Sequence, residues 1–388
     1  MYHHQVKRIL SLYIIREISL FFFLGIVIFT LVLLMGRLIK LTELVVSNGV
    51  PLADVGRMIL YLIPSFLVFT IPMAFLLAVL LAFGRLSADN EIIVLKASGI
   101  SLTQVMPPVL ICAVVVVMLG LGASMFGVPW GNTAFKELGL QVLKQNVTSS
   151  IREKTFWDDI PGVVMYTDHY DEQSRLLKGV VIHDGRNPKS PMTIFARDGG
   201  VTSESGSQAL LLTLHNGSIH VAGTDGLYRL VNFGEYSMTV GEKGGSTAIS
   251  RNESDLWLPE LQLQIDDPAT SPPDRLKMQA ELQSRFTFPF ASLVFAILAV
   301  PLGIQNRRSG KSGGFTLSIA IILTYYILMS VVRSLAEKGG GGLPTVALWL
   351  PNMLFFAMGW FFLRRASLEK TIPLFSLKNV LDYFRKAP

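Results

Sequence analysis

Few residues in this sequence have the types and spacing that catalytic or cofactor chemistry requires. Residues 310–312 (Gly-Lys-Ser) look like the end of a phosphate-binding loop, but that motif needs a further glycine where Gln305 stands. The six histidines form no HExxH motif, and His215 and His220, five positions apart, fall on opposite faces of a regular strand. The single cysteine, Cys112, excludes an internal disulfide and a Cys-based zinc site. We therefore predict no nucleotide site, metal site or cofactor in this chain.

Two cations with a spacing suited to binding an anion follow the first apolar stretch. Arg37 and Lys40 are three positions apart and therefore lie on one face of a helix. A phosphate that meets both cations gains charge-assisted hydrogen bonds, which are stronger than neutral ones. The alternative is that both side chains only anchor a helix end at the membrane surface, and Glu43 lies near enough in the sequence to pair with Lys40. The residue types alone leave both interpretations open.

A short helix is specified between the second and third apolar stretches. Ser87 is a suitable N-cap, and Gly99 suits the position just after a helix. Asp89 and Glu91 favour the positive end of a helix dipole. These signals predict a helix over about 87–98. Such a helix is either a plain connector or the element that the permease of an ATP-driven transporter inserts into a groove of its ATPase.

The chain that must position these residues has the composition of a membrane protein. Of its 388 residues, 51% are hydrophobic and 16% are charged, whereas about 25% are charged in an average soluble domain. A membrane-spanning helix needs about 20 apolar residues, and six uncharged stretches have about this length: 18–36, 58–84, 102–128, 286–306, 312–332 and 339–363. The third is ended at 128 because residues 129–132 (Pro-Trp-Gly-Asn) are typical of a turn.

All six stretches are expected to be spans of the mature protein. The first is too long for the core of a signal peptide, and no small-residue cleavage site follows it. No acidic residue lies deep in any predicted span, which argues against a proton-coupled or ion-coupled carrier, because such carriers place ionisable groups there. The energy for any transport is therefore expected from another subunit.

The basic charge of the chain is concentrated in its apolar parts. Residues 128–285 carry 15 positive and 20 negative side chains, whereas the rest of the chain carries 19 positive and 8 negative. Such a surplus fixes membrane orientation and does not indicate a nucleic-acid partner. With a cytoplasmic N-terminus, the cytoplasmic side holds fourteen lysines and arginines, against five in the short loops opposite. We therefore predict that both termini are cytoplasmic and that 128–285 lies outside the inner membrane.

The middle of the chain is predicted to be an all-β domain. Short β-rich runs occur at 162–167, 177–183, 192–197, 210–214 and 236–240. Turn dipeptides separate them, namely Asp184-Gly185, Asn216-Gly217 and Asp225-Gly226. Residues 252–273 have the composition of a linker, and a helix that starts near Asp274 carries Glu281 and Arg285 into the fourth span.

Several of these segments resemble one family. Residues 89–101 (Asp-Asn-Glu-Ile-Ile-Val-Leu-Lys-Ala-Ser-Gly-Ile-Ser) resemble the coupling-helix signature of the LptF/LptG permeases of lipopolysaccharide export. Residues 299–303 (Ala-Val-Pro-Leu-Gly) resemble the end of their fourth span, and Glu281-Leu-x-x-Arg285 resembles the approach to it. Residues 128–132 resemble the turn at which their third span leaves the membrane. The resemblance covers essentially the whole chain, and the fourth-span ending is closer to LptF than to LptG.

This resemblance implies a membrane α-helical fold of six transmembrane helices with an inserted all-β periplasmic domain, a β-jelly-roll. The implied domains are 1–128 with the first three helices and the coupling helix, 129–273 with the β-jelly-roll and a linker, 274–365 with the last three helices, and 366–388 as a cytoplasmic tail. The family also implies a place in the inner membrane of a Gram-negative bacterium.

The resemblance further implies partners, a cargo and site residues. A second LptF/LptG-type permease would form a heterodimer with this chain, an LptB-type ATPase dimer would hydrolyse ATP, and periplasmic LptC/LptA-type jelly-roll proteins would continue a bridge toward the outer membrane. Lipopolysaccharide would be the cargo. The implied roles are ATPase coupling for Glu91, Asp89, Ser87 and Gly99, and lipid contact for Arg37 and Lys40. The leucine-rich run 210–214 is apolar on both faces, so the β domain is expected to bind acyl chains and not to be a rigid spacer.

Three other interpretations stay open. The first is the permease of another lipid or lipoprotein export system, although lipoprotein-release permeases have four spans with the large domain after the first. The second is a lipid transporter or scramblase that needs no ATPase, and the helix around Glu91 argues against it. The third, a membrane enzyme, would need catalytic groups converging near one face, and the sequence shows none.

Overall fold

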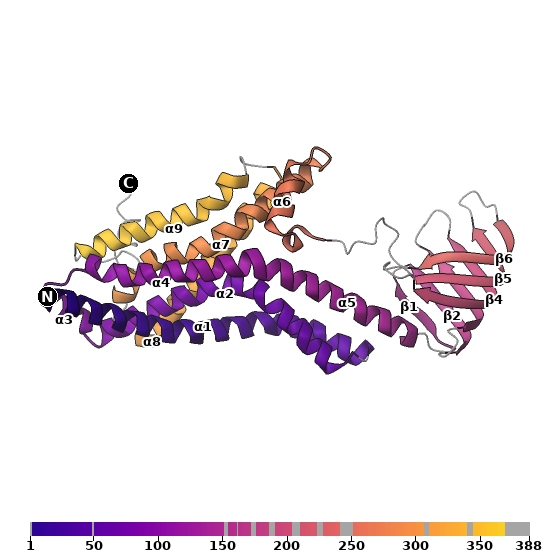
Figure 1. Ribbon diagram of the computed structural model, residues 1–388, viewed down its shortest axis with the longest axis horizontal. Coiled ribbons are helices and arrows are strands. Elements are labelled where there is room, and N and C mark those ends of the chain that lie inside the picture. The colour runs from indigo at the N-terminus through magenta and orange to yellow at the C-terminus, as the bar shows by residue number, and fades with distance from the viewer. Residues whose placement is uncertain are drawn as a thin grey trace, which may run out of the picture. The chain divides into compact units, whose positions relative to one another are not determined.

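The chain is divided into two compact units (Figure 1). The computed structural model describes residues 2–48, 50–150, 154–160, 162–171, 176–185, 191–203, 210–222, 228–240, 251–305, 310–339 and 344–368. The helical unit comprises Met1–Ile39, Ile59–Thr133 and Arg251–Pro388, and the β unit comprises Lys40–Met58 and Ala134–Ser250.

Most of the helices are long, and six stretches are apolar enough to cross a membrane. The helices are α1 Tyr2–Asn48, α2 Leu52–Ala88, α3 Glu91–Ala97, α4 Leu102–Gly122, α5 Val128–Ser150, α6 Leu258–Asp266, α7 Pro272–Gln305, α8 Gly310–Glu337 and α9 Pro344–Ser367. Within the described residues, the candidate spans are Arg8–Ile39, Leu52–Ala88, Leu102–Gly139, Pro272–Gln305, Gly313–Glu337 and Val346–Ser367. The prediction of a six-span membrane protein is confirmed.

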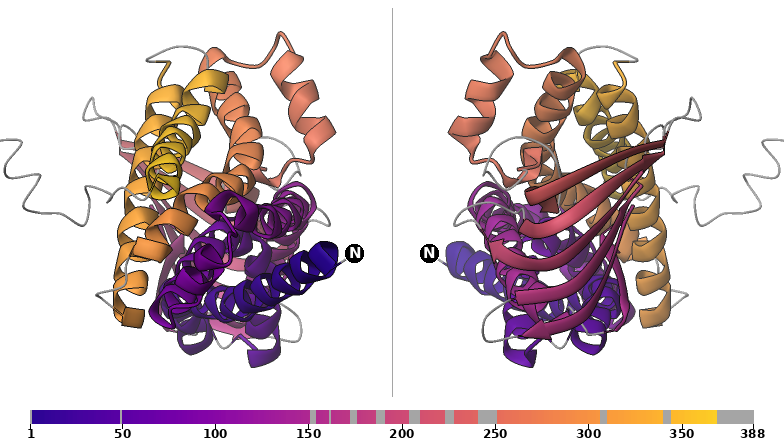
Figure 2. Two further views of the ribbon diagram at one scale, coloured as in Figure 1. Left: turned by 90° about the vertical axis from the view of Figure 1, so that its left-hand side faces the viewer. Right: turned by 90° about the vertical axis from the view of Figure 1, so that its right-hand side faces the viewer.

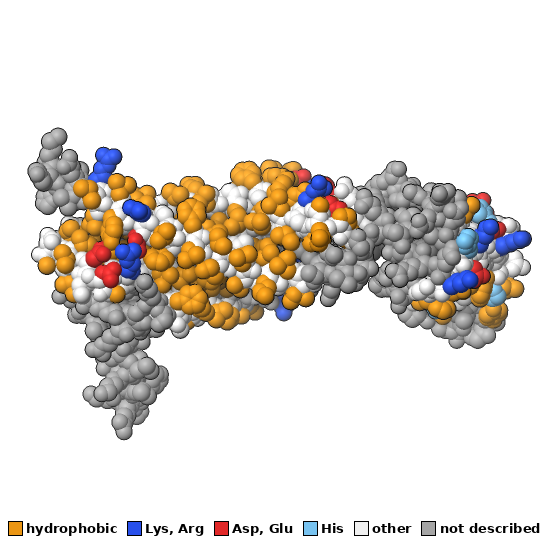
Figure 3. Space-filling model, turned by 90° about the horizontal axis from the view of Figure 1, so that it is seen from below, with side chains coloured by type: hydrophobic (Ala, Val, Ile, Leu, Met, Phe, Trp, Pro, Cys, Tyr) orange, Lys and Arg blue, Asp and Glu red, His pale blue; other side chains and the backbone are white. Residues whose placement is uncertain are grey.

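Helices α2 and α7 form the centre of the helical unit. In the most apolar 18 residues of each span, 72% of α2 and 78% of α7 is buried, against 22% of α1 and of α8. The two central helices approach closely, because a Cβ on Gly303 of α7 would lie 2.9 Å from the Cβ of Phe83 on α2. The face shown in Figure 3 has a broad apolar band with charged side chains toward its ends. This is the distribution expected of a surface that hydrocarbon covers.

The third span does not end where the sequence predicted. Helix α4 continues through a five-residue π-helix, η1 (Ala123–Gly127), directly into α5, so the turn predicted at 129–132 is wrong. A π-helix shifts the backbone hydrogen bonding by one residue, which accommodates Pro129 and its missing N–H. The glycine of this motif serves helix packing, because a Cβ on Gly131 would lie 2.3 Å from the carbonyl oxygen of Tyr61 on α2.

The β unit contains one antiparallel sheet of six described strands. They are β1 Phe156–Ile160, β2 Val163–Asp171, β3 Leu176–Asp184, β4 Met192–Ser203, β5 Leu210–Ala222 and β6 Tyr228–Val240. The strands lie side by side in sequence order, and the sheet is curved (Figure 2). The prediction of an inserted all-β domain is confirmed. Its described strands form an antiparallel meander, and the more specific jelly-roll form stays a prediction.

Apolar side chains from β2 to β6 form the core of the β unit. The buried members are Val163, Met165, Leu177, Val180, Ile182, Ile194, Ala196, Leu212, Leu214 and Met238. We call them the β-unit core. Leu212 and Leu214 come from the leucine-rich run, whereas the side chains of 210 and 211 lie outside the described residues. Binding of acyl chains by this domain stays a prediction.

One of the three predicted turn dipeptides is wrong. Asp184 ends β3 and Gly185 follows it, as predicted, whereas residues 225–226 lie outside the described part of the chain. Asn216 and Gly217 lie inside β5, and the strand does not reverse there. Asn216 has a φ of 54°, so the left-handed backbone that asparagine tolerates in turns is used here within a strand.

Candidate functional site

One end of the helical unit carries the predicted coupling helix, which is shorter than predicted. We call it the α3 end. Helix α2 continues to Ala88, and α3 spans Glu91–Ala97 after a turn. Ser87 is therefore not the N-cap; it is buried in α2, and its hydroxyl donates to the backbone carbonyl of Ile304 on α7 at 2.6 Å. The N-cap position is occupied by Asn90, whose φ of 58° ends α2 and starts α3 in a new direction.

The end of α3 agrees with the prediction. Gly99 has a φ of 79°, and its amide donates to the carbonyl of Lys96 at 2.9 Å. The next amide, that of Ile100, donates to the carbonyl of Leu95 at 3.0 Å. These two bonds form a Schellman motif, in which glycine is favoured because it has no Cβ. The prediction that Gly99 follows the helix is confirmed.

Charged residues connect the start of α3 to α1. Arg85 forms an ion pair with Glu17 of α1 and a second one, at 3.5 Å, with Asp89 in the turn before α3. Tyr13 of α1 donates its hydroxyl proton to Glu91 at 3.0 Å. We call Glu17, Arg85 and Asp89 the Arg85 cluster. Helix α1 is therefore bonded to the end of α2 and to the first residue of α3.

The outward side of α3 exposes aliphatic side chains together with Lys96. Ile92 is buried, whereas Ile93 and Val94 are 43% and 63% exposed. Glu91 is half-buried at the start of the same helix. A carboxylate near exposed aliphatic side chains suits binding in a groove of another protein, because the aliphatic groups gain burial and the carboxylate gains a directional bond.

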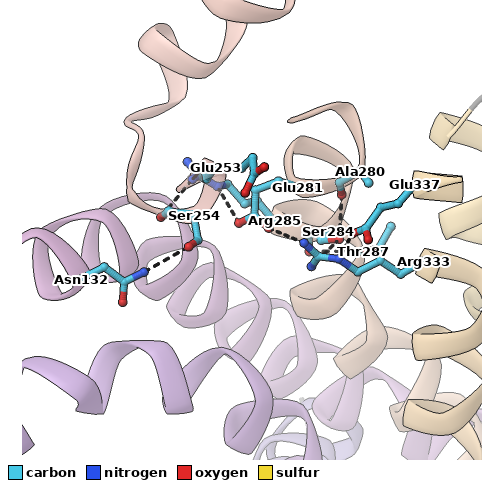
Figure 4. Close-up of polar contacts among 10 residues, drawn as sticks. All are labelled: Asn132, Glu253, Ser254, Ala280, Glu281, Ser284, Arg285, Thr287, Arg333 and Glu337. Atoms are coloured by element: carbon cyan, nitrogen blue, oxygen red, sulfur yellow. Dashed lines mark hydrogen bonds and ion pairs between the residues drawn. The ribbon is translucent and has the colours of Figure 1, made fainter. Parts of the chain in front are cut away.

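The opposite end of the helical unit, which we call the Arg333 end, holds a group of four charged residues, of which Glu281 and Arg285 are buried (Figure 4). Glu281 of α7 pairs with Arg285 of the same helix at 3.5 Å and with Arg333 of α8 at 2.9 Å. Arg333 also pairs with Glu337 at 2.9 Å. We call these four residues the Arg285 cluster. Because Arg285 is only 2% exposed, its charge depends on these partners and not on water.

Arg285 also positions the segment that precedes α6. Its Nη2 donates to the carbonyl oxygens of Glu253 and Ser254 at 3.1 and 3.3 Å (Figure 4). The Asn132 side chain donates to the Ser254 hydroxyl at 3.3 Å and accepts a hydrogen bond from Ser65 at 2.9 Å. The Val-Pro-Trp-Gly-Asn motif therefore ends in a residue that links α2, α5 and the segment before α6.

A pocket of about 320 Å³ opens beside the Arg285 cluster. Three arginines line it, namely Arg37 on α1, Arg285 and Arg333, together with Glu281. Its apolar lining includes Phe66, Phe69 and Phe288. The buried Nη1 of Arg285 has no hydrogen-bond partner among the described residues, which is rare for a buried charged group. The pocket combines N–H donors with apolar walls and is therefore suited to an anionic headgroup that carries acyl chains.

The structure brings only part of the predicted lipid-contacting pair to this pocket. Arg37 lines it, whereas the side chain of Lys40 lies outside the described residues. The sequence reasoning missed Arg333 and gave Arg285 no binding role. The sequence did contain a signal for an ion pair on each helix, because Glu281 and Arg285, and likewise Arg333 and Glu337, are oppositely charged and four positions apart at the edge of a span. No pattern in a single sequence indicates that the two pairs meet.

Comparisons with known proteins extend over the same elements. Residues 12–365 match the family described as lipopolysaccharide export system permease LptF/LptG. Lipopolysaccharide export system permease protein LptF of Escherichia coli K12 is 25% identical over 341 residues, which cover 85% of this chain and 88% of that protein. LptF of Shigella flexneri gives the same values. The uncharacterized protein RP871 of Rickettsia prowazekii is 22% identical over 312 residues, or 79% of this chain and 82% of that protein.

The family match runs from the first span to the sixth and includes α3, the Arg285 cluster and the β insertion. Its length leaves no part of the described architecture outside the family pattern except the start of α1 and the end of α9. The chain is therefore a multi-pass membrane protein that belongs to the LptF/LptG family of lipopolysaccharide export permeases.

Proposed function

We propose that this chain is the permease subunit of an ATP-driven transporter that extracts lipopolysaccharide from the inner membrane and passes it to a periplasmic bridge of β-jelly-roll proteins. The observation that carries the proposal is the division of chemistry between the two ends of the helical unit. One end has a short helix with exposed Ile93 and Val94, and the other has a cationic pocket with apolar walls. A lipid transporter driven by a separate ATPase requires both.

The α3 end binds an LptB-type ATPase dimer, which supplies the hydrolysis. Ile93 and Val94 enter a groove of the ATPase, and Glu91 accepts a charge-assisted hydrogen bond from a basic group there. Movement of α3 then reaches α1 through the Tyr13–Glu91 hydrogen bond and the Arg85 cluster. This chain itself hydrolyses no ATP in this mechanism.

The Arg333 end receives a lipid phosphate. Arg37 is exposed and meets the phosphate first, and Lys40, three positions later on α1, adds a second cation. Arg333, whose side chain is 34% exposed, provides a further donor at the pocket, and the buried Arg285 adds positive charge to its wall. The acyl chains lie against the phenylalanine side chains of the same pocket, so one site binds both parts of an anionic lipid.

The other partners are assigned from the orientation of the chain in the membrane. The α3 end and both termini face the cytoplasm, and the β unit lies in the periplasm. A second LptF/LptG-type permease pairs with this chain in the membrane. In the part of the sheet that the structure describes, β6 is an edge strand with exposed Leu230 and Val231. An LptC/LptA-type jelly-roll protein adds a strand there, and the β-unit core accepts the acyl chains in transit.

Reversal of the charge on α3 tests the proposal. The full chain with Glu91→Lys is purified with its permease and ATPase partners and reconstituted in vesicles that contain lipopolysaccharide. We expect the amount of co-purified ATPase to fall at least about tenfold, because one charge-assisted bond becomes a repulsion, and lipopolysaccharide release to a periplasmic acceptor to fall in parallel. Asp266→Lys, an equal reversal at an exposed position of α6, should leave both unchanged. A Glu91→Lys complex that assembles and exports like the parent contradicts the proposal.

A further inference from the structure

The sheet of the β unit contains a line of interrupted pairing that crosses five strands. On either side of it the register is regular, since Lys178 pairs with Asp198 and Val180 pairs with Ala196. Between such pairs, one opposing pair is skipped in each described ladder from β2 to β6. The skipped residues, which we call the crease, are Asp168, Gly179, Arg197, Asn216 and Gly234.

Left-handed backbone at two crease residues inverts the alternation of side chains along the strands. Gly179 has a φ of 64° and Asn216 one of 54°. Val180 and Ile182 are buried on one side of Gly179, and on the other side the buried residue is Leu177, which strict alternation would expose. The β-unit core therefore stays on one face of the sheet along its whole length. The crease presents its side chains on the other face.

A shallow, open pocket of about 550 Å³ lies over the crease. Its lining includes the exposed side chains of Asp168, Arg197 and Asn216 and the aromatic rings of Tyr166 and Phe195. These two rings alternate along β2 and β4 with buried residues, so they lie on the face opposite the β-unit core. The Tyr166 hydroxyl donates to Asp168 at 3.1 Å, which orients the carboxylate within the pocket.

The lining has the chemistry of a saccharide site. Aromatic rings pack against the C–H faces of pyranose rings, and the carboxylate and amide groups exchange hydrogen bonds with hydroxyls in defined directions. Arg197 forms no ion pair or hydrogen bond within the part of the chain that the structure describes, so its guanidinium is available to a phosphate or carboxylate. The lining extends from Tyr166 on β2 to Asn232 on β6. A site that crosses most of a sheet fits a chain of sugars better than one small ligand.

We propose that the crease binds the saccharide part of lipopolysaccharide, with Arg197 on one of its anionic substituents. The proposal rests on the proposed function, because export is what brings this glycolipid to the β unit. It adds a second contact of different chemistry, on the face opposite the β-unit core. The pocket reaches β6, the strand beside which the proposed function places the bridge protein, so a saccharide bound in the crease lies next to that protein.

The test uses the full chain in its complex with the permease and ATPase partners. The probe is the lipid-free, phosphorylated oligosaccharide that mild acid releases from lipopolysaccharide, and the readout is its Kd by titration calorimetry. We expect saturable binding that Arg197→Ala weakens at least about tenfold. Arg229→Ala, which removes an exposed arginine of β6 outside the pocket, should leave the Kd unchanged. Enzymatic removal of the phosphates should weaken binding to the parent and have little further effect on Arg197→Ala.

A second variant separates the side chain from the fold. Asn216→Gly keeps the left-handed backbone and removes the amide, so we expect an unchanged unfolding temperature and weaker oligosaccharide binding. Lack of saturable binding by the parent, or equal loss with Arg229→Ala, overturns the crease proposal. Export of intact lipopolysaccharide is measured on the same preparation: if the parent exports but does not bind the oligosaccharide, the crease assignment is wrong and the proposed function stands. If the parent neither binds nor exports, both are wrong.

Discussion

The two charged clusters of the helical unit use the same residue types but differ in burial. In the Arg85 cluster, the side chain of Glu17 is 9% exposed, but those of Arg85 and Asp89 are 38% and 53% exposed. In the Arg285 cluster, those of Arg285 and Glu281 are 2% and 11% exposed, and the outer pair, Arg333 and Glu337, is 34% and 32% exposed. Exposed ion pairs contribute about 0 to 1 kcal/mol each, whereas a buried charge depends on its partners. Water can therefore solvate Arg85 when it loses a partner, whereas Arg285 depends on its protein partners.

The largest effect should follow from removal of the central carboxylate of the buried cluster. Glu281→Ala leaves Arg285 and part of Arg333 without a counter-charge, and we expect a loss of about 3–5 kcal/mol in the free energy of unfolding. Chemical unfolding of the full chain in detergent measures it. Asp89→Ala in the exposed cluster should cost less than about 1 kcal/mol. Similar losses for the two variants would contradict the difference between the clusters.

A pair of glycine substitutions compares the packing of the same two ends. Gly131→Ala places a Cβ 2.3 Å from the backbone oxygen of Tyr61, which cannot rotate away, so we expect a loss of about 3 kcal/mol. Gly99→Ala meets no atom within 4 Å and costs only the strain of its positive φ, about 1 kcal/mol. Thermal unfolding followed by tryptophan fluorescence ranks the two. If Gly99→Ala is the more damaging, the α3 end is the more rigid one.

Arg37→Glu should change function more than stability. The side chain is exposed and lines the cationic pocket, so we expect lipopolysaccharide capture to fall about tenfold because a phosphate donor becomes a repulsive charge. Assembly with the ATPase should stay unchanged. Photo-crosslinking to lipopolysaccharide in vesicles measures the capture. Lys277→Glu, a reversal at an exposed position of α7 outside the pocket, is the control, and equal capture by Arg37→Glu and the parent would mean that Arg37 only anchors α1.

Glu17→Gln in the Arg85 cluster should cost less stability than Glu281→Ala. Glu17 is 9% exposed, but glutamine keeps a polar group there and Arg85 is 38% exposed, so water solvates the guanidinium that loses its counter-charge and the cost should be about 1 kcal/mol. The stimulation of ATP hydrolysis by lipopolysaccharide should nevertheless decrease, because the link from α3 to α1 is weakened. The ratio of hydrolysis rates with and without lipopolysaccharide gives the result. An unchanged ratio would show that this ion pair has no part in coupling.

The features that the sequence predicted correctly depend on short-range patterns. The six spans follow from hydrophobic length, and the end of α3 follows from one glycine that tolerates positive φ. The start of α3 was placed wrongly because a serine before acidic residues is a good N-cap in isolation, while Ser87 is used in a contact with α7. The third span was ended too early for a similar reason, since Pro129 follows a π-helix that no composition rule detects.

The features that could not be predicted depend on which segments meet. Arg333 is 48 positions from Arg285 along the chain, and only the packing of α7 against α8 brings both to Glu281. The crease could not be predicted either, because it depends on how neighbouring strands pair. Asn216-Gly217 has the composition of a turn, and its place in the middle of β5 is fixed by neighbouring strands that continue on both sides of it.

The unbroken course of α1 gives the protein a mechanical link between its two ends. Glu17 and Arg37 belong to one helix, and their 20-residue separation corresponds to a strut about 30 Å long. Helix α1 is packed loosely against the other helices, since only 22% of its most apolar 18-residue stretch is buried. In the proposed function, a tilt that the ATPase imposes at the Glu17 end would move Arg37 as well, without any change of fold in between. The stiffness of α1, and not a chain of side-chain rearrangements, would then transmit the movement between the two ends.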